Sequence, residues 1–169
     1  MTISMYQASV PVFQKMLGNL DHVCDKAAAD LTARKIDPGV FLQARLAPDM
    51  FHFTRQIQIA ADFAKGTPAR LAGVEVPKFE DNEASFADIK ARFRKTLDFI
   101  GGLKAAQIDG SEDRTINFKA GPRDLTFKGI DYLLMYALPN FYFHCTTAYA
   151  ILRHNGVVLG KTDYIQGRV

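Results

Sequence analysis

The residues best suited to chemistry in this chain are polar side chains set within apolar helical patterns. His144 follows the aromatic run Phe141–Phe143, and Asn140 lies four residues before it. Residues spaced i and i+4 share one face of a helix, so both side chains could reach one ligand. The imidazole could then act as an acid, a base or a metal ligand. Alternatively, His144 is a core residue whose ring nitrogens hydrogen-bond within the protein.

A second polar group lies in an earlier helical segment. Asp49, His52 and Gln56 are spaced at three and four residues, which places them on one helix face. If this face meets the face of Asn140 and His144, a mixed cluster of nitrogen and oxygen ligands forms. Two histidines with a carboxylate can hold a divalent metal, so His52 and His144 are candidate ligands for Zn or Ni. A structural role for His52 is the alternative.

Common catalytic signatures are missing from the sequence, which leaves open whether the protein is an enzyme. There is no phosphate-binding glycine loop, no nucleophile elbow and no H-E-x-x-H motif. Cys24 and Cys145 are far apart, which predicts two free thiols in the core rather than a disulfide or a zinc site. Tyrosine hydroxyls could line a pocket or be satisfied within the core. The tyrosines considered for this role are Tyr6, Tyr136, Tyr142 and Tyr149.

Composition and charge exclude several classes of protein. The chain has 169 residues, 48% of them hydrophobic, and a net charge of +3, which fits one globular domain over residues 1–169. The densest basic group, Lys90–Lys95, is interpreted as a solvated helix face rather than a nucleic-acid site. No signal-peptide pattern is present, and the apolar segment Ile130–Leu152 contains Asp131 and His144, which are unfavourable in hydrocarbon. We therefore expect a cytoplasmic protein that binds neither nucleic acid nor membrane.

Four main helices are needed to position these residues. Apolar residues recur at intervals of three and four along four segments, as in helices with one buried face. Pro11 either kinks the first helix or marks its first turn, and Pro139 is expected to kink the last helix or to break it, with the helix restarting at Pro139. The second helix is expected to stop at Gly66 and to restart briefly at Thr67. The predicted helices are Ser4–Arg34, Pro48–Gly66, Ser85–Ile100 and Asp131–His154.

A change of period after the third helix predicts a short β-hairpin. Thr115–Phe118 and Asp124–Phe127 alternate polar and apolar residues, and Ala120-Gly121-Pro122 lies between them. A lone hairpin is marginal in water, so this one should lie against the helices. The acidic segment Gly73–Glu83, before the third helix, predicts an irregular connection.

The sequence resembles an uncharacterised bacterial family, a domain of unknown function that is grouped with the DinB/YfiT-like bundles. The resemblance covers essentially the whole chain and implies an all-α, up-down-up-down four-helix bundle that is commonly dimeric. In this chain the hairpin would lie between the third and last helices. The segments that carry the resemblance are Met5-Tyr6, Arg45–Met50, Ala137–His144 and Ala148–Gly156.

The resemblance also implies a metal site. In the wider superfamily, three histidines bind a divalent metal, one on the second helix and an H-x-x-x-H pair on the last, with hydrolase or thiol-transfer activity as the usual suggestion. His52 matches the ligand of the second helix, and His144 matches the second member of the pair. Asn140 stands where the pair has its first histidine, and an amide oxygen is a poor substitute for imidazole toward zinc or nickel.

Three hypotheses for the function follow from these residues and this resemblance. The first is a small-molecule-binding relative of the DinB-like proteins with a degenerate metal site at His52 and His144. The second is a metal-dependent hydrolase or transferase, in which the metal activates a bound water. The third is a structural or partner-binding homodimer without catalysis. The residues expected to bind the ligand are Asp49, Gln56, Asn140 and Tyr142.

Overall fold

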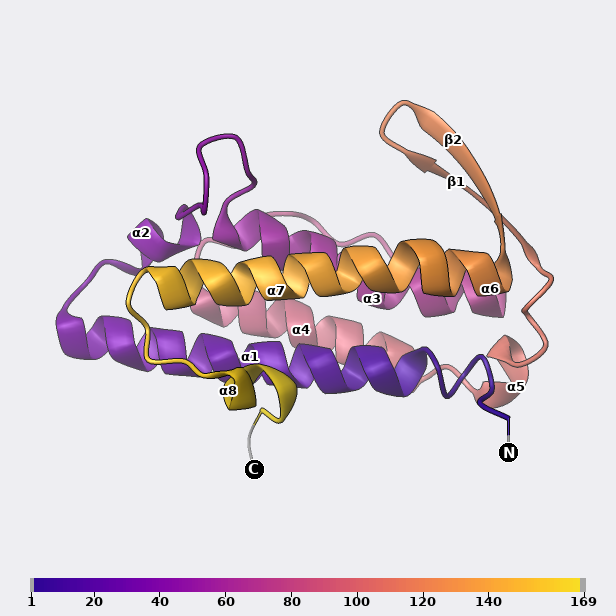
Figure 1. The fold of residues 1–169 in the computed structure, drawn as a ribbon, viewed down its shortest axis with the longest axis horizontal. Coiled ribbons are helices and arrows are strands. Elements are labelled where there is room, and N and C mark those ends of the chain that lie inside the picture. Colours follow the sequence, from indigo (N-terminus) through magenta and orange to yellow (C-terminus); the bar gives the residue numbers. More distant parts are fainter. Residues whose placement is uncertain (1, 168–169) are drawn as a thin grey trace.

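The computed structural model describes residues 2–167, which are mostly helical. Four long helices lie side by side around the apolar core (Figure 1). They are α1 (Val10–Arg34), α3 (Phe53–Ala72), α4 (Phe86–Gly101) and α7 (Leu138–His154). The shorter helical segments are α2 (Pro38–Leu42), α5 (Ala105–Ile108), α6 (Gly129–Asp131), the π-helix η1 (Tyr132–Ala137) and α8 (Lys161–Ile165). Within the described residues, no helix is long and apolar enough to cross a membrane.

Local signals set the first turns of α1 and α4. Pro11 lies in the first turn of α1, where its fixed φ and missing N–H are tolerated, so Ser4 is outside the helix that was expected to include it. At α4, the Ser85 Oγ accepts a hydrogen bond from the Asp88 backbone N–H at 3.1 Å. The Asp88 carboxylate accepts one in return from the Ala84 N–H. The capping signal at this helix is therefore confirmed.

Helix α3 differs from its predicted bounds at both ends. It begins directly after His52, not at residues 48–49, and His52 caps it: its Nδ1 accepts a hydrogen bond from the Arg55 N–H at 3.3 Å. The helix also continues through Gly66 and Pro68, where the sequence predicted a stop. Both residues are buried, and tertiary packing of a buried face outweighs the weak helix propensity of single residues.

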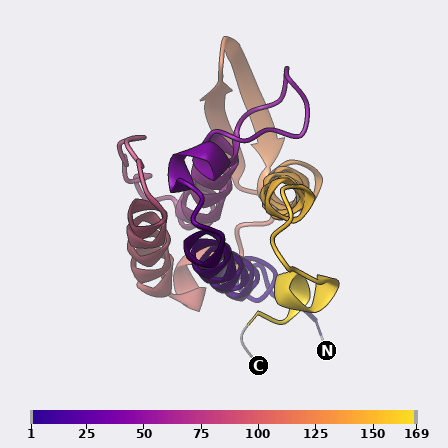
Figure 2. The same ribbon diagram turned by 90° about the vertical axis from the view of Figure 1, so that its left-hand side faces the viewer.

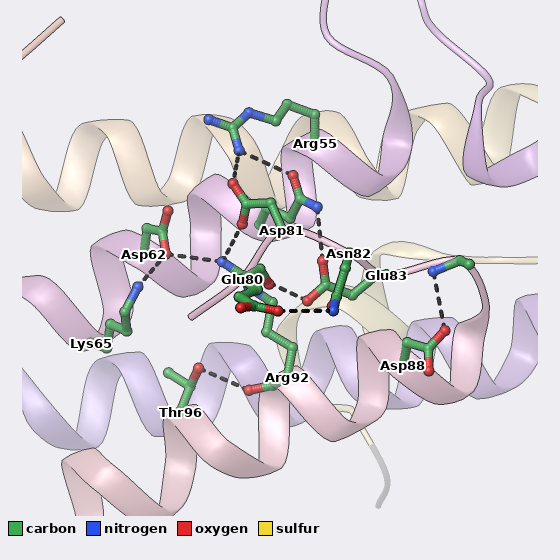
Figure 3. Close-up of polar contacts among 12 residues, drawn as sticks. Arg55, Asp62, Lys65, Glu80, Asp81, Asn82, Glu83, Asp88, Arg92 and Thr96 are labelled. Atoms are coloured by element: carbon green, nitrogen blue, oxygen red, sulfur yellow. Dashed lines mark hydrogen bonds and ion pairs between the residues drawn. The ribbon is translucent and has the colours of Figure 1, made fainter. Parts of the chain in front are cut away.

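Helices α3 and α4 are parallel neighbours, which corrects the expected up-down-up-down order. The start of α3 meets the start of α4 through Phe53 and Phe86, whose ring centroids are 5.8 Å apart. Further along both helices, Asp62 meets Arg92 at 3.1 Å. Figure 3 shows the two residue series advancing in the same direction. Because α1 and α7 run the opposite way (Figure 1), the four long helices follow the order up, down, down, up.

The connection 73–85 makes the parallel order possible. An extended segment of that length spans roughly 40 Å at about 3.3 Å per residue. Helix α4, with 16 residues, is only about 24 Å long. The chain can therefore return along the whole bundle before α4 begins. Short connections favour antiparallel neighbours, but a connection of this length is free of that constraint.

The side chain of Arg92 binds this connection to the helices. The prediction that Lys90–Lys95 form a solvated helix face is therefore wrong for Arg92. Its side chain is 1% exposed and pairs with Glu83 at 2.8 Å, with Asp81 at 2.9 Å and with Asp62 at 3.1 Å. Two of these carboxylates belong to the connection and one to α3 (Figure 3). A buried cation requires such compensation. Arg92 therefore ties α3, α4 and the connection together.

The last helical region continues past Pro139, where the sequence predicted a kink or a break. A π-helix, η1, directly precedes α7, and the ribbon is continuous from α6 to α7 (Figure 1). Proline lacks a backbone donor, and its ring crowds the turn before it. The wider turn of a π-helix relieves that crowding, so the helix axis carries on.

The predicted hairpin is confirmed, with strands β1 (Thr115–Ala120) and β2 (Arg123–Lys128) paired antiparallel. Gly121, at the turn, has a φ of +60°, as the first central position of a type II′ turn requires. The hairpin extends beyond the helices (Figure 1). Its apolar face nevertheless packs on η1, because the Phe118 ring lies 5.4 Å from that of Tyr132. Figure 2 shows the hairpin above α3 and α7 when the bundle is viewed end-on.

Candidate functional site

The polar centre of the candidate site is a hydrogen bond between α7 and α3. His144 is 9% exposed, and its Nδ1 lies 2.7 Å from Oε1 of Gln56. The Gln56 Nε2 donates to the carbonyl oxygen of Phe51 at 3.0 Å. Because a carbonyl oxygen only accepts, this contact fixes the amide and directs Oε1 at the imidazole. His144 therefore carries its proton on Nδ1, and Nε2 keeps a lone pair.

Burial keeps the His144 imidazole neutral. Desolvation, followed by the positive charge of Arg55, lowers the pKa of His144 to about 4. The ring also stacks on Phe63, with the centroids 6.3 Å apart and the planes at 18°. Among the described residues, no hydrogen bond involves Nε2. At neutral pH this nitrogen is therefore an acceptor available to a ligand.

His144 lines an open cavity of about 520 Å³ between α3, η1, α7, the hairpin and the loop before α3. Much of its wall is aromatic. The Phe118 ring of the hairpin lies 5.4 Å from both Tyr132 and Tyr136 of η1, so the hairpin closes this side of the cavity. Cavities of this size with apolar walls are typical sites for small organic ligands. The aromatic residues in the wall are Phe51, Phe63, Phe118, Tyr132 and Tyr136.

Cations outnumber carboxylates in the wall of this cavity. Asp62 is the one carboxylate among the lining residues, and it contacts Lys65 and Arg92 as well. Its charge is therefore already compensated by those two side chains. The cations in the wall are Arg55, Arg70, Lys119 and Arg123, the last two at the hairpin turn. Cationic side chains therefore dominate the charged part of the lining.

A smaller cavity of about 240 Å³ adjoins the site on the side of the loop before α3. His144 and Phe51 line both cavities, so the imidazole stands between them. The residues that line the smaller cavity are Asp49, Met50, Phe51, Gln56, Phe143 and His144.

The structure brings most of the predicted ligand-binding residues to these cavities. Asn140 and His144 share the larger cavity, as their spacing predicts, and Asp49 and Gln56 share the smaller one with His144. Tyr142 is 38% exposed and lines neither of the two. It follows the exposed side of α7, whereas His144 faces α3.

The side chains present do not fit the metal that the resemblance implies. His52 uses Nδ1 to cap α3 and lines neither cavity. The Asn140 Nδ2 donates to the Tyr136 carbonyl at 2.7 Å, and an amide nitrogen is a donor only, so a metal could use only the amide oxygen of Asn140. Across residues 2–167, no group of three or more His, Cys, Asp or Glu side chains could hold a metal ion. The structure therefore does not assemble His52 and His144 into a metal site.

Reasoning from the sequence missed the aromatic and cationic side of the larger cavity. Arg70 escaped notice because the second helix was expected to stop at Gly66, and Arg55 carried no recognisable motif. Two signals were available. The alternation in the hairpin places Phe118 on the face that meets the helices, and the spacing of Tyr132 and Tyr136 places both on one helix face.

Comparison with known proteins gives a consistent result over nearly the whole chain. The family described as "Domain of unknown function (DUF1993)" matches residues 5–165. The crystal structure of a DinB family member protein from Shewanella denitrificans is 40% identical, with a TM-score of 0.86. That match covers 96% of this chain and 92% of that chain. No curated protein matches at a significant level. The likeness therefore includes both helices that form the site.

Proposed function

Because this chain belongs to the DUF1993 family and is similar in structure to a DinB family member, we propose that it binds a small molecule at His144 without a metal ion. One observation carries the proposal: a neutral imidazole, oriented by Gln56, stands between two cavities with Nε2 unpaired among the described residues. Binding sites for small molecules combine apolar walls with a few fixed polar groups. The aromatic wall and this imidazole supply that combination.

The chemistry of the two polar groups limits what the ligand presents to them. Nε2 of His144 accepts a hydrogen bond, and so does the amide oxygen of Asn140. The Asn140 Nδ2 donates one N–H to the Tyr136 carbonyl and keeps a second N–H. A ligand N–H or O–H group would satisfy either acceptor. A ligand that buried these acceptors without donating to them would lose roughly 1–3 kcal/mol for each.

The proposal treats the site as a degenerate relative of the three-histidine metal sites. A catalytic zinc site typically has three protein ligands. Here His52 caps a helix and Asn140 stands where such a site has a histidine, so a metal-dependent hydrolase or transferase is less well supported. The geometry favours binding by hydrogen bonds and aromatic contacts instead.

Self-association is a second part of the proposal. The outer side of η1 and α7 exposes apolar side chains, and large exposed apolar patches commonly mark interfaces. A homodimer through this side is supported by the exposed fractions of four residues. These are Leu134 (42%), Met135 (73%), Tyr142 (38%) and Phe143 (56%). Sedimentation velocity of the wild type and of Met135→Glu tests it: a dimer that becomes a monomer supports it, and a wild-type monomer contradicts it.

A ligand screen by thermal shift, on chelator-treated protein without an affinity tag, tests the binding proposal. A ligand that binds the folded state raises its apparent stability. We expect compounds that raise the melting temperature of the wild type to lose this effect in His144→Ala. His154→Ala, an exposed histidine at the end of α7, is the matched control and should respond like the wild type. Stabilisation that requires added Zn or Ni, or that persists in His144→Ala, would contradict the proposal.

A further inference from the structure

We infer that the ligand of the larger cavity is an organic anion with a flat aromatic body, whose anionic group is held by Arg70. The inference deepens the proposed function and rests on it, because it concerns the same cavity. It is carried by the distribution of charge in the wall, by the way Arg70 is held and by the arrangement of the rings around it.

The charges of the wall single out Arg70. Arg55 is paired with Asp81 at 2.5 Å, so its positive charge is largely compensated within the protein. Lys119 lies 3.9 Å from Asp124, and both side chains are highly exposed. Arg123 is exposed as well, so water already solvates its charge. Among the described residues, Arg70 has no carboxylate partner although it is half-buried. A guanidinium removed from bulk water without an anion is a natural place for a carboxylate or phosphate.

Arg70 is held in a fixed position by aromatic side chains. One Nη donates to the Tyr132 hydroxyl at 3.1 Å. The guanidinium carbon also lies 4.9 Å from the centre of the Phe118 ring and 6.0 Å from that of Tyr132. These cation–π contacts are made by the guanidinium group as a whole, and the hydrogen bond to Tyr132 uses one of its five N–H donors. Most of its donors are therefore left for an anion, in a geometry set before binding.

The rings beside Arg70 suit a flat aromatic body. Tyr132 and Tyr136 have nearly parallel rings, at 22° with centroids 6.1 Å apart. Phe118 and Phe63 contact Tyr136 at 5.4 Å and 5.9 Å respectively. An additional ring placed against this group gains offset-stacked or edge contacts, beyond the gain from apolar burial. Aliphatic anions would use Arg70 but not these contacts.

Calorimetric titration with small probes tests both halves of the inference. The aromatic anions are 6-hydroxy-2-naphthoate and 4-hydroxyphenyl phosphate. They separate a carboxylate from a phosphate, and the phenolic O–H of each can donate to an acceptor of the site. The uncharged match is 6-hydroxy-2-naphthamide, and the non-aromatic matches are acetate and inorganic phosphate. We expect at least one aromatic anion to bind the wild type more than tenfold tighter than its matches. Arg70→Gln should weaken that binding at least tenfold, and Arg94→Gln, an exposed arginine on α4, should leave it unchanged.

Equal binding of 6-hydroxy-2-naphthamide and 6-hydroxy-2-naphthoate would overturn the inference. So would equal binding of 6-hydroxy-2-naphthoate to the wild type and Arg70→Gln. Arg70→Lys is the control for misfolding of Arg70→Gln. It keeps the positive charge but lacks the planar guanidinium, and we expect intermediate affinity with a normal melting curve.

The same titrations distinguish failure of the inference from failure of the proposed function. If neutral probes bind and lose affinity only in His144→Ala, the inference is wrong and the proposed function stands. If anions depend on Arg70 but not on His144, the inference stands and the role of His144 is wrong. If none of the probes binds, the inference is overturned.

Discussion

The Nδ1 atom of His144 lies 2.7 Å from Oε1 of Gln56, and this contact joins residues 88 positions apart in the chain. It decides which imidazole nitrogen is left for a ligand. Gln56 itself is fixed by its bond to the Phe51 carbonyl, so the proton on Nδ1 follows from geometry alone. Binding of a ligand at Nε2 of His144 depends on that arrangement.

Replacing Gln56 tests the arrangement directly. Gln56→Glu puts a carboxylate beside Nδ1, and an opposite charge at hydrogen-bond distance favours the imidazolium. We therefore expect the pKa of His144 to rise from about 4 by one unit or more, measured by NMR titration of ¹⁵N-labelled protein. Gln107→Glu adds the same charge at an exposed site on α5 and should leave His144 unchanged. An unchanged pKa in Gln56→Glu would show that the two side chains do not meet in solution.

The buried imidazole also predicts how stability depends on pH. The pKa of His144 is about 4 in the folded protein and ordinarily about 6.5 in an unfolded chain. Between these two pH values only the unfolded state takes up the proton. The contribution of the neutral His144 to the free energy of unfolding is therefore complete above pH 6.5 and is lost as the pH falls toward 4. The loss amounts to roughly 3 kcal/mol at most.

Urea unfolding at several pH values between 4 and 7 measures this effect. The free energy of unfolding should fall more steeply with decreasing pH in the wild type than in His144→Gln. His154→Gln removes an exposed histidine instead and should keep the wild-type slope. Identical slopes in the wild type and His144→Gln would mean that His144 titrates normally when folded.

Arg92 should be far more important for stability than its neighbours on α4. Arg92→Met leaves the Glu83 carboxylate, 6% exposed, without its cation, and breaking a buried pair costs about 3–5 kcal/mol. The double variant Arg92→Met/Glu83→Gln should recover part of that loss. Arg94→Met, at an exposed position, should change the free energy of unfolding by no more than about 0.5 kcal/mol. Similar values for the two single variants would contradict the buried network.

Gly129 should tolerate no side chain at the base of the hairpin. A Cβ atom there would lie 2.0 Å from the backbone oxygen of Ser111, so the two crossing chain segments would have to separate. We expect Gly129→Ala to destabilise the protein by about 2 kcal/mol or more in thermal or urea unfolding. Gly18→Ala, at an exposed helical position with open space, should instead stabilise it by about 0.5–1 kcal/mol. A neutral Gly129→Ala would mean that the hairpin is not held in this way.

Periodicity and capping signals predicted most of the helices and strands, but they did not predict the relative directions of the four long helices. The helices, the hairpin and the cap at Ser85 follow from local patterns in the sequence, and they are confirmed. The parallel pairing of α3 and α4 depends on Arg92 meeting carboxylates of the connection, a non-local contact that spacing along one helix does not reveal. The same limit explains why Lys90–Lys95 was interpreted as wholly solvated.

Only part of the candidate site was predicted, again because local spacing can be read from the sequence and contacts between distant segments cannot. Asn140 and His144 share a cavity because the i, i+4 spacing is local. The partner of His144 turned out to be Gln56, one turn after His52, because His52 became the cap of α3. Where a helix begins is set by competing capping groups, and the pattern alone did not resolve it. The cytoplasmic location and the absence of a nucleic-acid partner stay predictions.

The central claim is that a small molecule binds at His144 in metal-free protein. Its most direct test is NMR of chelator-treated, ¹⁵N-labelled protein, titrated with a compound that raised the melting temperature. We predict that the Nε2 resonance of His144 shifts on binding while Nδ1 keeps its proton, and that the shift is saturable without added metal. A His144 spectrum that stays unchanged at saturation, or one that changes only after Zn or Ni is added, would contradict the claim.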